Sequence, residues 1–170
     1  MMGPDRPNVA LRPMLPADAA ALAAIYVSSI EELTGEDYDI NQQSAWAARG
    51  DDPEEFGREL QGWLTLVATI EGEPAGFGSL KGTGQIEMLY VHPAAVGQGV
   101  ASVLCDALER LAAARKAALV TVDASDTAQG FFAKRGYQAR IRKTLQLGEE
   151  WLGTTAMEKS LVASPALKTH

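Results

Sequence analysis

A short loop rich in small residues carries the clearest chemistry in this sequence. From Tyr90 to Ala101 the chain reads YVHPAAVGQGVA, in which an apolar segment stops at His92-Pro93, and Gly97 and Gly99 precede a helical pattern. A helix N-terminus offers unpaired backbone N–H groups and the positive end of the helix dipole. Glycines let the backbone approach a ligand closely. The loop therefore predicts an anion site, most simply for a phosphate group.

The elements on either side of the loop must hold it in place. Before the loop, residues 84–91 (GQIEMLYV) are apolar and are followed by a proline, which cannot donate to a strand ladder, so they predict a central strand. After the loop, apolar residues recur at three- and four-residue spacing, which is typical of a helix with one buried face. These residues are Val100, Val103, Leu104, Ala107, Leu108 and Leu111.

The remainder of the chain predicts strands and helices separated by glycine, proline and acidic turns. The expected strands cover residues 8–14, 63–70, 75–81, 84–91, 118–122, 138–147 and 151–161. The expected helices cover 16–30, 42–60 in an irregular form, the segment after the loop, and 126–135. Tight turns connect the strands between residues 63 and 91, which predicts an antiparallel meander before the glycine loop.

Length and composition exclude several classes of protein. A chain of 170 residues with 46% hydrophobic composition suits one domain, expected over residues 1–161 with a flexible tail at 162–170. No stretch reaches the ~20 apolar residues of a membrane span and no signal peptide is evident, so we expect a cytoplasmic protein that does not bind membranes. A formal charge of −7 opposes binding to nucleic acid. One cysteine and two histidines form no metal-ligand cluster, so no metal is expected.

Two nucleotide-binding folds share features of the loop. A dinucleotide fold needs a third glycine where this chain has Ser102, and a ribose-binding carboxylate, for which Asp123 stands near the end of the next strand. The antiparallel meander and the single βαβ unit argue against that fold. A nucleoside-triphosphate loop needs Gly-Lys followed by Ser or Thr, which does not follow here.

The loop and a second segment, SDTAQGFFAKRGY at residues 125–137, together resemble the GNAT superfamily of acetyl-CoA-dependent N-acetyltransferases. The family's loop, Gln/Arg-x-x-Gly-x-Gly/Ala, falls on residues 96–101, with Val96 in place of the polar residue. The second segment keeps the spacing of Asn-x-x-Ala-x-x-Phe-Tyr-x-Lys-x-Gly-Phe, with Ser125 for asparagine and Phe132 for tyrosine. Residues 38–46 (YDINQQSAW) and 157–159 resemble a poorly characterised bacterial branch of the superfamily.

This resemblance implies an α/β fold of the α+β kind. A central mixed, mostly antiparallel sheet of about six or seven strands would be flanked by about four helices and splayed where CoA binds. Acetyl-CoA is the implied cosubstrate, with its pyrophosphate held largely by main-chain N–H groups. The residues that the resemblance assigns to the cosubstrate are Leu89, Tyr90, Val91, Val96, Gly97, Gln98, Gly99, Val100, Ala101, Ser102, Ser125 and Phe132.

Acetyl transfer to an amine needs a deprotonated nucleophile, donors for the developing oxyanion and stabilisation of the leaving thiolate. Glu87 is the candidate general base. It alternates with Leu89 and Val91, so the three residues share one side of a regular strand, opposite to Tyr90. A cross-strand partner for a lysine or arginine is the alternative role for Glu87.

The candidate acids follow from a substitution. Many family members carry a tyrosine that protonates the leaving thiolate where this chain has Phe132, and a phenyl ring has no proton to donate. Ser125 and Tyr137 are the substitute candidates for this acid. Tyr137 also suits a structural role, as the aromatic residue that closes a helix against the sheet.

The acceptor site is expected near an acidic segment. Between Arg12 and Arg49 the chain contains no lysine or arginine, while acidic residues crowd positions 31–39 and could attract a cationic amine. In the family this region forms one wall of the acceptor site, which implies Glu31, Tyr38 and Trp46 as acceptor contacts. A solvated acidic loop is the alternative interpretation.

The sequence therefore predicts an N-acetyltransferase that moves an acetyl group from acetyl-CoA to a primary amine by direct attack in a ternary complex. The acceptor would be a small molecule or a peptide. The alternative is a catalytically weak acyl-CoA-binding sensor or interaction module with the same fold, which Val96 and Phe132 favour. Exposed strand edges and the final hairpin could also pair two copies into a homodimer.

Overall fold

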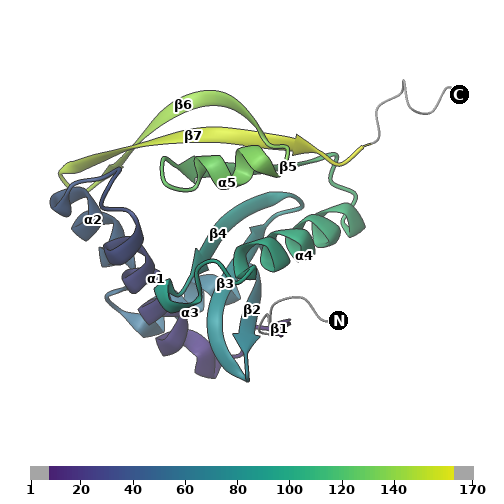
Figure 1. The fold of residues 1–170 in the computed structure, drawn as a ribbon, viewed down its shortest axis with the longest axis horizontal. Coiled ribbons are helices and arrows are strands. Elements are labelled where there is room, and N and C mark those ends of the chain that lie inside the picture. The colour runs from purple at the N-terminus through teal and green to yellow at the C-terminus, as the bar shows by residue number, and fades with distance from the viewer. Residues whose placement is uncertain (1–7, 163–170) are drawn as a thin grey trace, which may run out of the picture.

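A computed structural model describes residues 8–162, which form one seven-stranded sheet (Figure 1). The strand order is β1-β2-β3-β4-β5-β7-β6, and neighbouring strands are antiparallel except for β4 and β5, which are parallel. The sheet confirms the predicted meander and fold class. The strands are β1 (Val9–Pro13), β2 (Leu64–Ile70), β3 (Glu73–Lys81), β4 (Gln85–Val91), β5 (Leu119–Ser125), β6 (Gln138–Leu147) and β7 (Glu150–Ser160).

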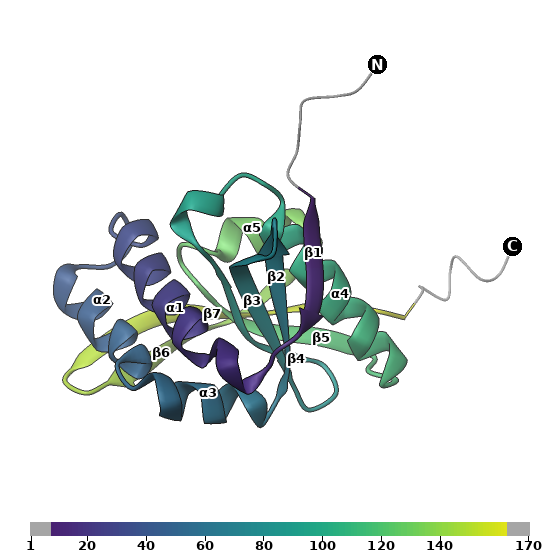
Figure 2. The same ribbon diagram turned by 90° about the horizontal axis from the view of Figure 1, so that it is seen from below.

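Helices cover both faces of this sheet, as the two ribbon views show (Figures 1 and 2). One face carries α1, α2 and α3, whereas α4 packs on the other face, next to α5. Their bounds are α1 (Ala19–Leu33), α2 (Ile40–Ala47), α3 (Pro53–Gln61), α4 (Val100–Ala114) and α5 (Gln129–Lys134). Three short 3-10 turns, η1 (Pro16–Asp18), η2 (Ala48–Gly50) and η3 (Pro93–Ala95), complete the described elements.

The irregular helical segment expected at residues 42–60 is two helices, which is why the described residues hold five α-helices where about four were expected. Asp39 begins α2 with a capping box, since its side chain accepts from the Gln42 N–H at 2.8 Å and its own N–H donates to Gln42 Oε1 at 2.9 Å. Asp52 begins α3, with Pro53 at the first helical position. The second cap turns the chain and places Arg49 between the two helices.

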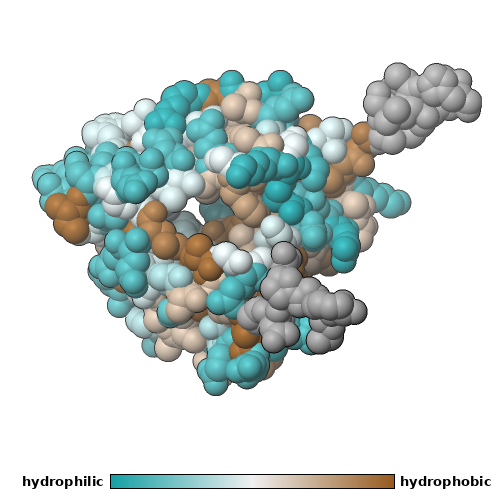
Figure 3. Space-filling view, in the orientation of Figure 1, coloured by the Kyte–Doolittle hydropathy of each residue, from teal (hydrophilic) through white to brown (hydrophobic). Residues whose placement is uncertain are grey.

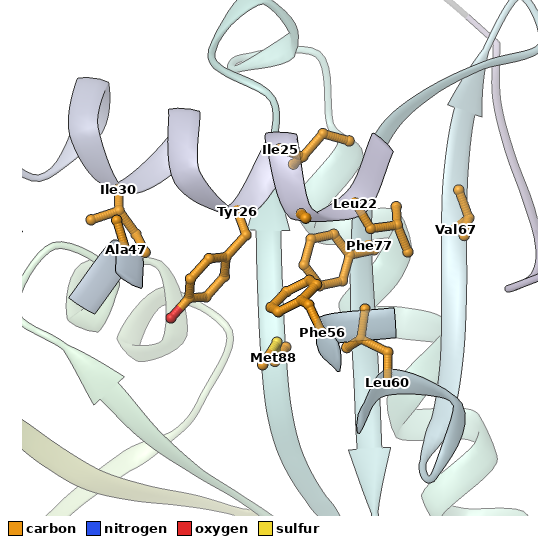
Figure 4. Close-up of a cluster of buried hydrophobic side chains, with 11 residues drawn as sticks. Leu22, Ile25, Tyr26, Ile30, Ala47, Phe56, Leu60, Val67, Phe77 and Met88 are labelled. Atoms are coloured by element: carbon orange, nitrogen blue, oxygen red, sulfur yellow. The ribbon is translucent and has the colours of Figure 1, made fainter. Parts of the chain in front are cut away.

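Three apolar clusters on the two faces fix the helices on the sheet. Between α1, α3 and the sheet lie Tyr26, Phe56, Phe77 and other buried side chains (Figure 4). Burial of each large side chain contributes roughly 1.5–3 kcal/mol. On the other face, Gly76 of β3 lets α4 approach, because a Cβ at Gly76 would lie 2.8 Å from Val100 Cγ1. That close contact holds the first residue of α4, and therefore the glycine loop, against the sheet.

No helix within residues 8–162 is long and apolar enough to cross a membrane. The flexible tail expected at 162–170 lies outside the described residues beyond Val162.

Candidate active site

The glycine loop joins β4 to α4. The His92 side chain accepts a hydrogen bond from the Ala94 N–H (3.0 Å) and so begins the short η3 turn. Gly97 and Gly99 then adopt left-handed conformations, at φ +86° and +84°, which other residues rarely adopt. A Cβ at either glycine would meet no atom within 4 Å. The backbone of the loop therefore borders open space that a ligand can enter.

The backbone amide groups of this loop are available to bind an anion. Within residues 8–162, the backbone N–H groups of Gly97, Gly99 and residues 100–102 make no hydrogen bond, and the first bond of the helix end runs from Val103 N to Gly99 O at 3.0 Å. The first turn of α4 carries no acidic residue, so the positive end of its dipole is not neutralised there. The Val96 side chain, 53% exposed, adds no polar group. The loop therefore offers an anion mainly backbone N–H groups, together with the Ser102 hydroxyl in the first turn of α4.

The sheet opens beside the loop. β4 and β5 pair through only two residue pairs, Gln85 with Thr121 and Ile86 with Val122, whereas β5 stays paired with β7 as far as Ser125. A cavity of about 900 Å³ lies where the two strands diverge, and its wall includes residues from α1, α2, β4, β5, α5, β6 and β7. Figure 3 shows the hollow, with hydrophobic side chains gathered around it. The splay expected from the family resemblance is thus present.

A bulge in β4 changes the direction of Glu87. Ser79 of β3 lies opposite Met88, but the next residue of β3, Leu80, lies opposite Ile86, so Glu87 is the extra residue. Its carboxylate accepts from Gln85 Nε2 at 3.3 Å. Burial raises the pKa of the Tyr90 hydroxyl to about 12, and the charge of Glu87 contributes to the rise. The bulge breaks the alternation of β4 at Glu87, and the charge of Glu87 acts on both Tyr90 and Arg49.

This geometry corrects the expectation that Glu87 shares a side with Leu89 and Val91. Those two side chains pack toward α4, whereas the charge of Glu87 acts on Arg49 of η2. The prediction was wrong because it assumed a regular strand, and the bulge breaks the alternation. Glu87 and Leu89 both line the cavity nevertheless, since the opening of the sheet exposes both faces of β4 there.

Aromatic side chains form the wall on the α1 side of the cavity. The Tyr26 hydroxyl donates to the Trp46 backbone carbonyl at 2.9 Å, and Trp46 Nε1 donates to the Tyr90 hydroxyl at 3.3 Å. The rings of Tyr26 and Tyr90 meet edge to face, with centroids 4.7 Å apart. Arg49 lies beside them, and its Nε donates to Glu59 Oε1 at 2.9 Å. This wall is held rigidly by bonds among its own members.

The candidate acids have different positions. Ser125 lines the cavity, and its Oγ accepts from the Ala128 N–H at 3.1 Å, which leaves the hydroxyl proton free to donate. Phe132, 3% exposed, also lines the cavity. Tyr137 is not in the cavity wall. Its buried hydroxyl donates to Glu109 Oε2 at 2.7 Å, and burial raises the pKa of Tyr137 far above its usual value. The expected acid role of Tyr137 has no support in this geometry, whereas its structural role does.

The expected acceptor residues are only partly brought together. Trp46 lines the cavity, but Glu31 is exposed outside it. Tyr38 is buried away from the cavity, where its hydroxyl donates to Gly153 O at 2.7 Å and accepts from Asp126 N at 2.9 Å. The acidic segment at 31–39 therefore contributes no carboxylate to the wall, and the interpretation of a solvated acidic loop fits better.

Sequence reasoning missed several residues of the wall. Arg49 and the ion pair of Lys143 with Asp123, 3.1 Å apart, line the cavity. So do Leu145, Leu147 and Leu152 of the β6–β7 hairpin. The sequence predicted the two strands of the hairpin, but it could not show that one face of the hairpin turns toward the opening of the sheet.

Comparison with known proteins agrees with this arrangement. A family model described as an acetyltransferase (GNAT) domain matches residues 34–161. The chain is 31% identical over 144 residues to the uncharacterized N-acetyltransferase YafP of Escherichia coli (strain K12), which covers 85% of this chain and 91% of that protein.

Solved structures give the same result. A GCN5-related N-acetyltransferase from Rhodopseudomonas palustris superposes with a TM-score of 0.89 at 56% identity, over 95% of this chain and 99% of that chain. The structure of yncA from Salmonella typhimurium with its cofactor acetyl-CoA superposes with a TM-score of 0.62 at 22% identity, over 93% of this chain and 98% of that chain. With unpartnered amides at Gly97, Gly99 and residues 100–102 and with an opened sheet, this chain belongs to the GNAT family of N-acetyltransferases.

Proposed function

We propose that this GNAT N-acetyltransferase moves an acetyl group from acetyl-CoA to a primary amine by direct attack in a ternary complex. The proposal rests on one observation: a single cavity extends through the opened sheet. The cavity wall includes Phe132 of α5 and Ser125 of β5 together with Trp46 of α2 and with Tyr90 and Glu87 of β4. A donor and an acceptor held in one cavity react without a second encounter, which accounts for much of the advantage of an enzyme.

The donor site is built from backbone groups. The pyrophosphate is expected at the amides of Gly97, Gly99 and the first turn of α4, which make no bond within the described chain. Beyond Ile86, the edge of β4 that faces β5 has no strand partner. The pantetheine amides can pair with this edge near Leu89 and Val91, as an added strand would. The acetyl-CoA bound to yncA, which has the same fold, supports this choice of donor.

The reaction then proceeds in balanced steps. Glu87 removes a proton from the substrate ammonium, directly or through a water molecule, and the neutral nitrogen attacks the thioester carbonyl. A backbone N–H of β4 near Leu89 stabilises the oxyanion. When the tetrahedral intermediate collapses, the C–S bond breaks, the nitrogen loses its remaining extra proton and the thiolate takes up one proton. Ser125, the candidate acid that lines the cavity, gives its proton to the thiolate and receives the proton from the nitrogen, while the proton on Glu87 returns to water. The products are the N-acetyl amide and free CoA.

Gly99→Glu tests the donor site. The new side chain would bring a negative charge to the anion site and would strain a residue at φ +84°. We expect acetyl-CoA binding, measured by calorimetry, to be lost. Gly72→Glu is the matched control, since Gly72 has φ +83° and equally open surroundings in the β2–β3 turn. Acetyl-CoA binding that persists in the folded Gly99→Glu variant would refute the assignment.

A catalytically weak acyl-CoA-binding module is the second candidate function. Phe132 and the buried Tyr137 favour it, because neither side chain offers an acid to the thiolate. Thiol release across a broad library of amines separates the two functions, once acetyl-CoA binding has been measured. Binding without turnover for every amine supports the module, and one efficiently acetylated amine eliminates it.

A further inference from the structure

We infer that the acceptor is a primary monoamine with an apolar body, rather than a polyamine or an amino acid. The inference rests on the proposed acetyl transfer and names the substrate class of that site. It follows from two properties of the cavity wall: the balance of charges among its side chains, and the large share of apolar side chains on the acceptor side.

The wall has one negative charge without an ion-pair partner. Its charged residues are Arg49, Glu87, Asp123 and Lys143. Asp123 is paired with Lys143 at 3.1 Å, and Arg49 is paired at 2.9 Å with Glu59 of α3. Glu87 makes no ion pair within residues 8–162. One ammonium group therefore finds a counter-charge in the cavity.

Additional charges on the acceptor would not be matched. A second ammonium of a polyamine would find no unpaired carboxylate among the residues of the wall, and the carboxylate of an amino acid would find no unpaired cation. Placing an unmatched charge in such a site costs free energy. The exposed acidic segment contributes no carboxylate to the wall: Asp37 accepts from Thr127, which is a residue of the wall, and Asp39 caps α2.

Large apolar side chains dominate the rest of the acceptor side, although the hydroxyl residues Ser29, Thr34, Thr144 and Thr154 also line the cavity. Leu33, Trp46, Met88 and Tyr90 line it from α1, α2 and β4, and Leu145, Leu147 and Leu152 line it from the hairpin. Leu145 is 49% exposed although it belongs to the wall. An apolar group of the acceptor would cover such a side chain and remove it from water. The aromatic and aliphatic walls thus fit the body of the substrate, and Glu87 fits its amino group.

A panel of five amines tests the inference with the full chain and acetyl-CoA. Thiol release is followed for 2-phenylethylamine, isoamylamine, ethanolamine, spermidine and L-phenylalanine. We expect kcat/KM for the two apolar monoamines to exceed that for the other three by at least about tenfold, the usual discrimination of an apolar pocket. An equal or higher kcat/KM for ethanolamine, spermidine or L-phenylalanine overturns the inference and leaves acetyl transfer standing. Failure of all five amines, with acetyl-CoA bound, also overturns the inference, and the broad amine library then decides whether acetyl transfer stands.

Leu145→Ser tests whether the preference for apolar monoamines comes from the cavity wall. This variant should lower kcat/KM for 2-phenylethylamine about fivefold or more, with little change for ethanolamine, so that the ratio between them falls. Ile141→Ser is the control, because Ile141 is an exposed apolar residue of the same strand, 64% exposed, and is not in the wall. The affinity for acetyl-CoA is measured for both variants, and an unchanged affinity shows that the donor site is intact. An unchanged ratio in Leu145→Ser, or an equal fall in Ile141→Ser, overturns the assignment of the wall.

Discussion

At the scale of single residues, the position of Glu87 depends on one irregularity of the backbone. The β4 bulge breaks the alternation of side chains at Glu87, whose carboxylate accepts from Gln85 Nε2. In a regular strand the same side chain would point toward α4 with Leu89. Bulges commonly redirect a side chain beside an active site, and here the bulge lies where the sheet opens. The candidate base Glu87 therefore directly follows Ile86, the last residue of β4 that pairs with β5.

Glu87→Gln should remove the base and leave the donor site unchanged. The amide cannot take a proton from the ammonium, so we expect kcat to fall about 10²- to 10⁴-fold, the usual contribution of a positioned base. Acetyl-CoA affinity should stay the same, because the backbone of the loop provides that binding. Steady-state kinetics and calorimetry measure the two effects. Glu73→Gln, at the exposed start of β3, is the control. A kcat within twofold of the original enzyme would exclude Glu87 as the base.

Sequence patterns located the loop better than the catalytic residues, for a physical reason. Gly97 and Gly99 are needed locally, by a backbone at positive φ, and local needs are visible in a sequence. The direction of Glu87 depends on how β4 pairs with β3, and the burial of Tyr137 depends on Glu109 of α4. Both contacts join segments far apart in the chain, so residue type and spacing alone could not predict them.

At the scale of elements, the sequence predicted each strand and most helices but not the division between α2 and α3. Strands follow from short apolar segments and turns, whereas the order β5-β7-β6 depends on packing between distant segments. The entry into α1 shows how polar side chains fix such junctions. Arg12 of β1 forms two hydrogen bonds with Asp18 of η1, at 2.7 and 2.8 Å, and Asp18 also accepts from Leu15 N.

This junction predicts a defined pH dependence of stability. The hydrogen bonds from Arg12 hold the pKa of Asp18 below its usual value. A lowered folded-state pKa means that the stabilisation is complete above the unfolded-state pKa, about 3.9, and is lost as pH falls through the folded-state pKa. We expect Arg12→Met to lower the free energy of unfolding by about 1 kcal/mol at pH 7, as for a partly exposed pair. The difference from the original protein should shrink below about pH 4.

Urea unfolding at pH 7, 5, 4 and 3 measures this difference. Arg58→Met is the control, because Arg58 pairs with Glu54 on the exposed surface of α3 at 3.3 Å. Its effect should be smaller at pH 7. A difference between the Arg12→Met variant and the original protein that stays constant from pH 7 to pH 3 would contradict the role of Asp18.

At the scale of the whole molecule, the opened sheet needs support away from the strands that part. β4 and β5 share two residue pairs, so the two halves of the sheet are joined weakly at the cavity. Hydrogen bonds from the segment around α2 join them again at the far end of the hairpin. Gln42 Nε2 donates to Trp151 O at 2.7 Å, and Tyr38 bridges Gly153 O and Asp126 N. The α1–α2 connection, whose first residue Thr34 lines the cavity, thus also supports the cavity from outside.

Tyr38→Phe should weaken this second connection. The substitution leaves the Asp126 N–H and the Gly153 carbonyl without their partner, so we expect the free energy of unfolding to fall by roughly 1–3 kcal/mol. Amide exchange should accelerate in residues 123–128, which comprise the end of β5 with Ser125 and the turn that follows. Tyr137→Phe is the matched control, since it removes another buried tyrosine hydroxyl, bonded to Glu109 of α4. Urea unfolding and hydrogen exchange followed by mass spectrometry compare the two variants. If both destabilise the protein but exchange in residues 123–128 is the same, Tyr38 does not hold the two halves of the sheet together.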